Sequence, residues 1–216
     1  GAEVRGAGGS VITVSSKKPL HGCVHRVIPD RIVTATYLCA AAAAGGDVTL
    51  RNTQHRHLAA VTTALQQAGC TVTCGEDYIR LQRGAPLHAI APVRTAPYPG
   101  FPPDGQAILM AALLQSRGTT VFVENIFQSR YRHVPELIRM GADIRTEGRV
   151  AVVCGTDTLH GAEVVATDLR GGAALTVAGL AAEGVTTVQG VGHIHRGYED
   201  LPAHLRSLGA QITEEI

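Results

Sequence analysis

The sequence contains no tryptophan and few other aromatic residues. Its 216 residues include three phenylalanines and five tyrosines, so aromatic residues make up only 4% of the chain. Large rings therefore cannot build most of the core. Apolar residues still account for 45% of the chain, which argues against disorder and suffices for a buried core. We expect Ala, Val, Leu and Gly to form that core, and such small residues favour close packing of backbones.

The chain also lacks an excess of charge of either sign. Nineteen Lys and Arg residues face eighteen Asp and Glu residues, which gives a formal net charge of +1. Nucleic-acid and membrane partners usually require a basic patch, so neither is favoured, whereas small anions need only a few arginines. No apolar run approaches the ~20 residues that span a bilayer, and no signal peptide is recognisable. We therefore predict a soluble, cytoplasmic protein.

Neither the cysteines nor the histidines form a recognisable metal or disulfide pattern. The five cysteines are odd in number and lack the spacing of a zinc site. We predict that all five are reduced thiols. Two pairs of histidines, His55 with His57 and His193 with His195, have no carboxylate at a fixed spacing, which favours solvated side chains. The sequence thus predicts no metal and no cofactor. The cysteines are Cys23, Cys39, Cys70, Cys74 and Cys154.

Three segments repeat a helix end, a glycine and the start of a strand. Glycine suits the left-handed position that ends a helix. Two other markers recur in step with these segments: a glycine before a β-branched strand, and an aspartate before the preceding helix. The three segments are residues 65–72 (LQQAGCTV), 137–144 (LIRMGADI) and 205–212 (LRSLGAQI). The other markers are Gly46, Gly118 and Gly184, and Asp30, Asp104 and Asp168.

The two helices of each repeat differ in kind. The first is apolar nearly all round, which predicts burial on every side, and the second is amphipathic, which predicts a surface position. The sequence therefore predicts an α/β fold of three β-α-β-α-β-β repeats with buried inner helices, an inside-out α/β barrel with pseudo-threefold symmetry. The expected inner helices are 35–44, 107–114 and 173–182. Apolar positions of the outer helices are Leu58, Val61, Leu65, Val134, Leu137 and Ile138.

The N-terminus reads as the end of another repeat. Residues 1–4 and 11–14 resemble residues 141–144 and 150–153, the strand–turn–strand tail of the second repeat. We expect the chain to begin and end within repeats and to be part of a longer protein. We assign residues 1–20 to tail strands of a preceding domain, or to a swapped strand that closes the third repeat or pairs with another copy. Residues 21–216 form one domain, with repeats at about 21–90, 91–160 and 161–216.

Four further motifs stand out along the chain. They are residues 94–104 (RTAPYPGFPPD), 124–137 (ENIFQSRYRHVPEL), 166–170 (ATDLR) and 193–199 (HIHRGYE). Together, and in order along the whole chain, they resemble the UDP-N-acetylglucosamine enolpyruvyl transferases of peptidoglycan synthesis. That family has two such three-unit domains around a cleft, and it transfers the enolpyruvyl group of phosphoenolpyruvate to the 3′-hydroxyl of UDP-N-acetylglucosamine, releasing phosphate. The resemblance implies a C-terminal half, with those two substrates and an N-terminal domain as partners.

Asp104 is the candidate catalytic residue. By position alone it is a helix N-cap, as Asp30 and Asp168 are. Prolines stiffen its approach. The resemblance makes Asp104 the carboxylate that contacts the sugar 3′-hydroxyl and acts as its base. We expect Asp168 to cap its helix, with at most a supporting role in the site.

Three arginines are candidate anion ligands. Arg170 lies at the start of a buried helix, where anions are favoured, and Arg196 lies in a turn. The resemblance implies that both meet phosphoenolpyruvate when the domains close, and Arg130 is a third candidate. It also implies that Ile126 and Phe127 line the uridine nucleotide, although from the residues alone a core role is equally expected.

Several residues depart from the family pattern. His195 stands where the family usually has Asp, and Val33 replaces a Glu. Pro103 replaces a Thr before Asp104, and Gly105 follows it. These departures leave the main charged groups in place and affect the tuning of the site. The absence of the other cleft wall predicts no transferase activity for this chain alone. The alternatives are a non-catalytic binding module with this fold, or half of a shikimate-pathway enolpyruvyl synthase, against which residues 101–104 and 133–137 argue.

Overall fold

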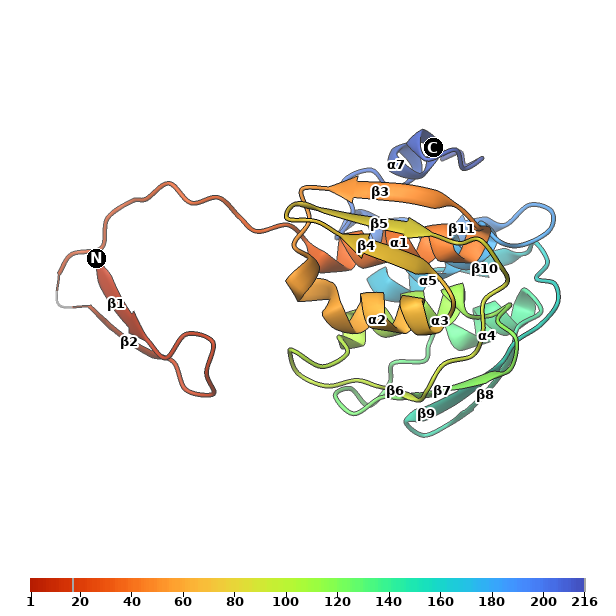
Figure 1. Cartoon of the computed structure of the whole chain (residues 1–216), viewed down its shortest axis with the longest axis horizontal. Helices are drawn as coiled ribbons and strands as arrows, with labels where there is room; N and C mark the ends of the chain where they lie inside the picture. Colours follow the sequence, from red (N-terminus) through yellow and green to blue (C-terminus); the bar gives the residue numbers. More distant parts are fainter. Residues whose placement is uncertain (17, 216) are drawn as a thin grey trace.

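The computed structural model describes residues 1–16 and 18–215, which form an N-terminal hairpin and a body of helices and sheets (Figure 1). The strands are β1 (Ala2–Arg5), β2 (Thr13–Ser16), β3 (Asp47–Arg51), β4 (Thr71–Cys74), β5 (Tyr78–Gln82), β6 (Val93–Arg94), β7 (Thr119–Val123), β8 (Asp143–Glu147), β9 (Val150–Cys154), β10 (Glu163–Val165) and β11 (Thr187–Gln189). The helices are α1 (Arg31–Ala44), η1 (His55–Leu58), α2 (Ala59–Gln67), α3 (Pro103–Ala112), α4 (Val134–Arg139), α5 (Leu169–Gly179), α6 (Gly192–His195) and α7 (Leu201–Ser207).

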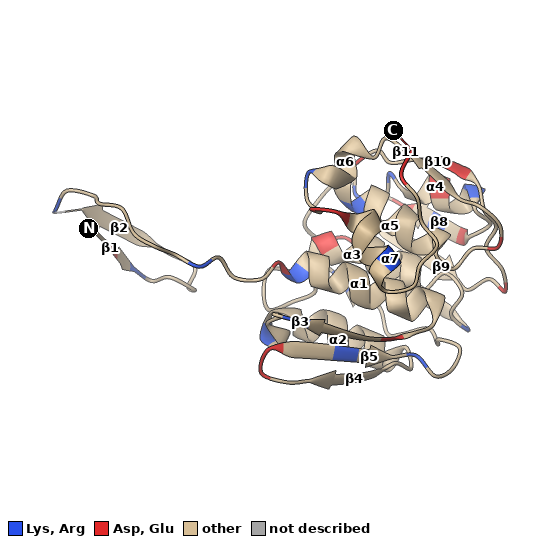
Figure 2. Ribbon diagram, turned by 90° about the horizontal axis from the view of Figure 1, so that it is seen from above, with Lys and Arg blue, Asp and Glu red and all other residues tan. Residues whose placement is uncertain are grey.

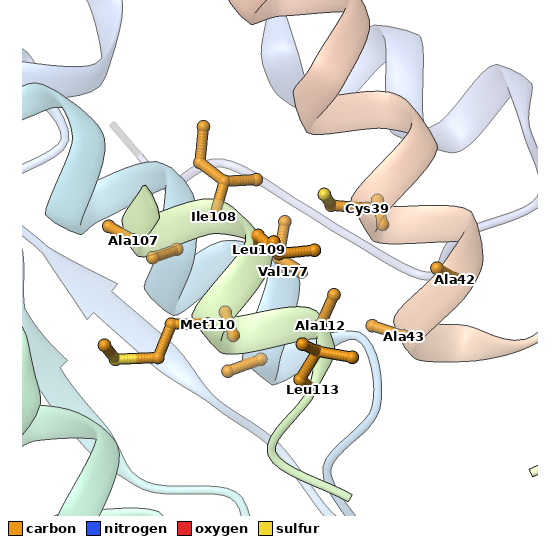
Figure 3. Packing of buried hydrophobic residues seen from close by; sticks show 14 of the residues in the cluster. Cys39, Ala42, Ala43, Ala107, Ile108, Leu109, Met110, Ala112, Leu113 and Val177 are labelled. Carbon is orange, nitrogen blue, oxygen red and sulfur yellow. The ribbon is translucent and has the colours of Figure 1, made fainter. Parts of the chain in front are cut away.

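Helices α1, α3 and α5 form the centre of the body, as predicted. Each packs against the other two, and nearly all of their residues are buried. Small side chains allow this: Ala43 of α1 faces Ala112 of α3 in Figure 3. At Gly172 of α5, a Cβ atom would lie 2.8 Å from the side chain of Ile194, so only glycine fits. The core is therefore built on close backbone approach, as the shortage of aromatic residues predicts.

Each inner helix carries one charged residue, and that residue lies in its first turn. Arg31 begins α1, Asp104 is the second residue of α3, and Arg170 is the second residue of α5. The rest of each helix is uncharged, and Figure 2 shows charge mainly on loops, strands and helix ends. Burial explains this distribution, because a charge in the middle of these helices would lose its hydration.

Sheets cover the inner helices on the outside (Figure 1). The first unit has the order β3-β5-β4, all antiparallel, and the second has β6-β7-β9-β8, in which β6 and β7 are parallel. The third unit has only the parallel pair β10-β11. The three-unit α/β fold with buried inner helices is thus confirmed, and the second unit is the most complete.

The outer helices follow the expected pattern with one exception. Val61 and Leu65 of α2, and Leu137 of α4, are buried. Ile138 is the exception: it is 47% exposed although it shares the apolar spacing of the buried positions in α4, which is only six residues long. The glycines that follow α2, α4 and α7 are left-handed, with φ of 104°, 96° and 97°, which confirms them as helix stops.

Strands are missing at both ends of the repeat series. Residues 19–29, before α1, and residues 210–215, after α7, form no strand, contrary to the expected repeat pattern. In the second and third units, the strand before the inner helix pairs in parallel with the strand after it. The expected partner of residues 19–29 is therefore β3, which lies at an edge of its sheet and is not paired with them. For residues 210–215 the expected partner is a following tail strand, and the described residues contain none there. The hairpin strands β1 and β2 pair with each other and not with β10 or β11, so β2 does not close the third unit within this chain.

Candidate active site

The first turns of the inner helices differ in how they are capped. Asp30 accepts hydrogen bonds from the backbone N–H groups of Ile32 and Val33, at 2.7 and 3.3 Å. Asp168 likewise accepts from Arg170 N and Gly171 N, at 3.0 and 2.8 Å. Both carboxylates therefore satisfy free helix donors, and both predicted caps are confirmed.

Asp104 does not cap its helix, so that part of the prediction was wrong. Helix α3 begins at Pro103, and its N-cap residue is Pro102. Proline is well suited to the first helical position because it has no N–H to satisfy. The helix therefore starts ahead of Asp104, whose carboxylate is left free to bind other groups.

Two of the three predicted arginines converge on Asp104. Arg130 forms an ion pair with the Oδ1 atom of Asp104. The Nη2 atom of Arg170 lies 3.6 Å from its Oδ2 atom. The two guanidinium groups thus hold one carboxylate between them and leave an excess positive charge at this point, which suits an anionic ligand.

Aromatic rings support both arginines. The guanidinium carbon of Arg130 lies 4.9 Å from the centre of the Phe127 ring, and that of Arg170 lies 5.9 Å from the Tyr198 ring. Arg170 also donates a hydrogen bond of 3.4 Å to the Tyr198 hydroxyl, which is 2.8 Å from the hydroxyl of Thr36 in α1. Burial raises the pKa of Tyr198, so its hydroxyl keeps its proton and remains neutral beside Arg170.

This network joins the N-terminal halves of all three inner helices. Asp104 belongs to α3, Arg170 to α5, and Thr36, in the second turn, to α1. The N-terminal end of a helix carries a partial positive charge and free N–H groups. Because Asp30 and Asp168 already accept N–H groups at the starts of α1 and α5, the preference for anions rests mainly on Arg130 and Arg170. Sequence reasoning missed the role of Tyr198, for which the only signal was its place in the motif 193–199.

Ile126 and Phe127 lie on an exposed loop after β7. Their side chains are 41% and 46% exposed, so the core role considered for them is wrong. The Phe127 ring faces Arg130 and is therefore at the edge of the site. The buried residue before them, Glu124, accepts hydrogen bonds from both of their backbone N–H groups, at 2.7 and 2.9 Å. Glu124 was not among the predicted site residues.

Arg196 is not brought to this cluster. It lies exposed at the C-terminal end of α6, and within the described part of the chain it makes no ion pair with Asp104. Its neighbour His195 lies in a short helix rather than in a strand or turn, and its Nε2 atom is 2.9 Å from the Oε1 atom of Glu214. His195 is therefore not solely solvated, contrary to the prediction for this histidine pair.

A buried histidine lies behind the arginines. His133 is only 1% exposed, and its Nε2 atom has no hydrogen-bond partner among the described residues. Burial lowers the pKa of His133 to about 4; Asp168 acts in the opposite direction, and Arg130 adds to the lowering. His133 is therefore neutral near pH 7. Its burial was not predictable from the sequence beyond its place between loop and helix.

Several other kinds of site receive no support within residues 1–16 and 18–215. That part of the chain contains no cluster of three or more His, Cys, Asp or Glu side chains suited to a metal ion. It likewise has no helix long and apolar enough to cross a membrane. All five cysteines are free thiols, and none of them contacts the Asp104 cluster through a hydrogen bond in the described residues.

Comparison with known proteins gives relatives that are all named as 1-carboxyvinyltransferases. The model of the family described as EPSP synthase (3-phosphoshikimate 1-carboxyvinyltransferase) matches residues 1–205. The UDP-N-acetylglucosamine 1-carboxyvinyltransferase of Zymomonas mobilis is 50% identical, covering 98% of this chain and 50% of the relative. That of Desulfofundulus thermocisternus is 51% identical, covering 98% of this chain and 87% of the relative.

Solved structures agree on the fold. The enolpyruvyl transferase NikO from Streptomyces tendae matches with a TM-score of 0.83 and 29% identity, over 99% of this chain and 51% of that one. EPSP synthase from Acinetobacter baumannii matches with a TM-score of 0.65 at 19% identity, over 86% and 43% of the two chains. The chain thus spans about half the length of most of these proteins. The family match and the sequence identities together show that the chain belongs to the EPSP synthase (3-phosphoshikimate 1-carboxyvinyltransferase) family.

Proposed function

We propose that this chain supplies one wall of an active site that transfers the enolpyruvyl group of phosphoenolpyruvate to the 3′-hydroxyl of UDP-N-acetylglucosamine. The observation that carries the proposal is the Asp104 carboxylate, which is released from helix capping and held by Arg130 and Arg170. The names of the relatives at 46–51% identity favour UDP-N-acetylglucosamine over shikimate 3-phosphate as the acceptor.

The chemistry assigned to each residue follows from charge. In the transfer, the sugar 3′-oxygen bonds to C2 of the enolpyruvyl group, the bond from C2 to the phosphate oxygen breaks, and the hydroxyl proton leaves with phosphate. Asp104 receives that proton first, as the base. An anionic substrate group bound by Arg130 and Arg170 competes with Asp104 for their guanidinium groups and so frees the carboxylate for the hydroxyl.

The remaining predicted residues act at the edge of this centre. Arg196 closes on phosphoenolpyruvate from the exposed end of α6, and Ile126 and Phe127 lie along the uridine nucleotide. Asp168 supports the site by fixing the first turn of α5, which carries Arg170. The other cleft wall, an N-terminal domain, is needed to exclude water and to complete the grip on the substrates.

A two-step experiment tests the proposal. Calorimetric titration of the chain with UDP-N-acetylglucosamine should show binding, whereas shikimate 3-phosphate should not bind. Phosphate release from phosphoenolpyruvate should then be absent with this chain alone and appear when an N-terminal half from a relative is added. Preferential binding of shikimate 3-phosphate would overturn the acceptor assignment. Binding without any phosphate release in the complemented mixture would indicate a non-catalytic binding module.

A further inference from the structure

The residue that follows the strand after the inner helix differs among the three units. Strands β3, β7 and β11 are followed by Asn52, Glu124 and Gly190, each six positions after its marker glycine. Asn52 and Gly190 have left-handed backbones, with φ of 55° and 74°, whereas Glu124 does not. Asn and Gly are the residues that adopt this conformation most readily. Two units therefore leave the strand by a backbone turn, and the second unit leaves it with a buried carboxylate.

The Glu124 carboxylate accepts three hydrogen bonds on one oxygen. Its Oε1 atom accepts from the hydroxyl of Thr95 at 2.8 Å and from the N–H groups of Ile126 and Phe127 at 2.7 and 2.9 Å. Thr95 is fully buried and directly follows β6. Asn125 completes the arrangement, because its N–H donates to the Thr95 hydroxyl at 2.8 Å and its Nδ2 atom to the Thr95 carbonyl at 3.1 Å.

These bonds join the two chain segments that carry the central ion pair. One segment runs from Thr95 through residues 96–103 to Asp104. The other runs from Glu124 through Phe127 to Arg130, whose guanidinium lies over the Phe127 ring at 4.9 Å and binds Asp104. Fixing the first residues of both segments to one carboxylate limits how far the Asp104 and Arg130 side chains can move apart.

The fold itself does not require this carboxylate. Glu124 is 1% exposed, and its second oxygen, Oε2, is buried with no hydrogen-bond partner among the described residues. A buried polar oxygen that lacks a partner lowers stability. The first and third units form their strand ends without such a group, at Asn52 and Gly190. A costly residue found only in the unit that holds Asp104 is typical of a functional position.

We propose that Glu124 is a positioning residue: its carboxylate fixes the loop 125–130 so that Phe127 meets the nucleotide and Arg130 holds Asp104. This inference rests on the proposed function for the identity of the ligand. The order of the loop is independent of the proposed function, because it can be measured in the absence of any ligand.

The test replaces the charge while keeping the shape, with Glu124→Gln, and uses Glu147→Gln as a matched control. Glu147 is an exposed residue at the end of β8 in the same sheet. Hydrogen bonds to a charged acceptor are about twice as strong as those to a neutral one. We therefore expect amide exchange at Ile126 and Phe127 to accelerate about tenfold in Glu124→Gln and to be unchanged in the control.

Ligand affinity separates positioning from general stability. In Glu124→Gln, the affinity for UDP-N-acetylglucosamine should fall about tenfold, a loss that corresponds to ~1.4 kcal/mol. The affinity for phosphoenolpyruvate should fall by a smaller factor, because Arg170 lies on α5 and not on the loop 125–130. A merely structural role would lower the melting temperature and weaken both ligands equally, and that result would overturn the inference. Unchanged exchange at both amides would overturn it as well.

Variants of Thr95, and amide exchange measured without ligand, provide two further tests. Thr95→Val removes one donor to Glu124 with little change of shape, and it should shift exchange and affinity in the same direction by a smaller factor, whereas Thr95→Ser should restore both. If the unaltered chain binds no UDP-N-acetylglucosamine, the proposed function fails, and the exchange rates at Ile126 and Phe127 alone decide the role of Glu124.

Discussion

Asp104 and Asp168 lie at the starts of neighbouring inner helices, but their carboxylates bind different groups. Asp168 caps α5 by accepting two backbone N–H groups, as Asp30 does in α1. Asp104 lies two positions inside the stretch that Pro102 begins, and it binds Arg130 and Arg170 instead. A shift of the helix start by two residues thus converts a structural carboxylate into one that is available for chemistry.

The second unit also carries polar groups in places where the other units are apolar. His133 corresponds to Val61 in the first unit and Leu201 in the third, counted from the repeated segments 65–72, 137–144 and 205–212, and all three side chains are buried. Buried polar groups without full hydrogen bonding lower stability. The second unit therefore combines the most complete sheet with the least favourable core, a combination that fits a unit built around a site.

The largest expected effect lies at Asp104. Asp104→Asn keeps the shape but removes the base, so phosphate release in the complemented assay should fall about 10³-fold, within the range for loss of general base catalysis. Asp30→Asn is the matched control, because Asn caps helices as well as Asp does, and activity there should be unchanged. Equal losses of activity in the two variants would show that Asp104 has no catalytic role beyond that of the capping aspartate Asp30.

The next effect is a pH dependence of stability that belongs to the second unit. Because burial lowers the pKa of His133 to about 4, the unfolded chain binds its proton near pH 6.5 while the folded chain does not. At pH 7, protonation of His133 in the unfolded chain has little effect on the free energy of unfolding. As the pH falls below the unfolded pKa, the free energy of unfolding decreases, by about 2 kcal/mol at pH 5.

His133→Gln should remove this acid-induced loss, measured by urea unfolding at pH 7 and pH 5. His193→Gln is a suitable control because His193 is exposed. An equal acid-induced loss in His133→Gln and the unaltered chain would show that His133 is not the source.

The smallest effect concerns the caps. Asp30→Ala and Asp168→Ala should each lower the free energy of unfolding by about 1 kcal/mol, the usual cost of losing an N-cap. Asp104→Ala removes no cap, and it removes only ion pairs of a partly exposed carboxylate with Arg130 and Arg170, so it should cost less. Thermal unfolding of the three variants side by side would check this order, and an equal or larger loss at Asp104 would contradict it.

The repeats were readable from the sequence because each rests on local chemistry. The glycines after α2, α4 and α7, the apolar inner helices and the caps Asp30 and Asp168 all follow from rules that act within a few residues. The strands expected at residues 19–29 and 210–215 are the failures, because strand formation depends on pairing with another segment, which local sequence does not determine.

The site was only partly predictable for the same reason. The motifs identified Asp104, Arg130 and Arg170, which the structure brings together. They did not indicate that Glu124, His133 and Tyr198 are buried beside them, since burial depends on what packs against a residue from distant parts of the chain. The roles of Arg196, Ile126 and Phe127 stay predictions, as do the proposed domain boundaries.

The sequence by itself determined the three units, their small-residue core and the charged residue in the first turn of each inner helix, because these depend on periodicity, side-chain size and the cost of burying charge. Only the tertiary structure decided that Asp104 meets two arginines from different segments. The helix start follows from local chemistry, because Pro103 suits the first helical position. Which distant guanidinium groups reach the free carboxylate depends on packing between units, which local rules do not encode.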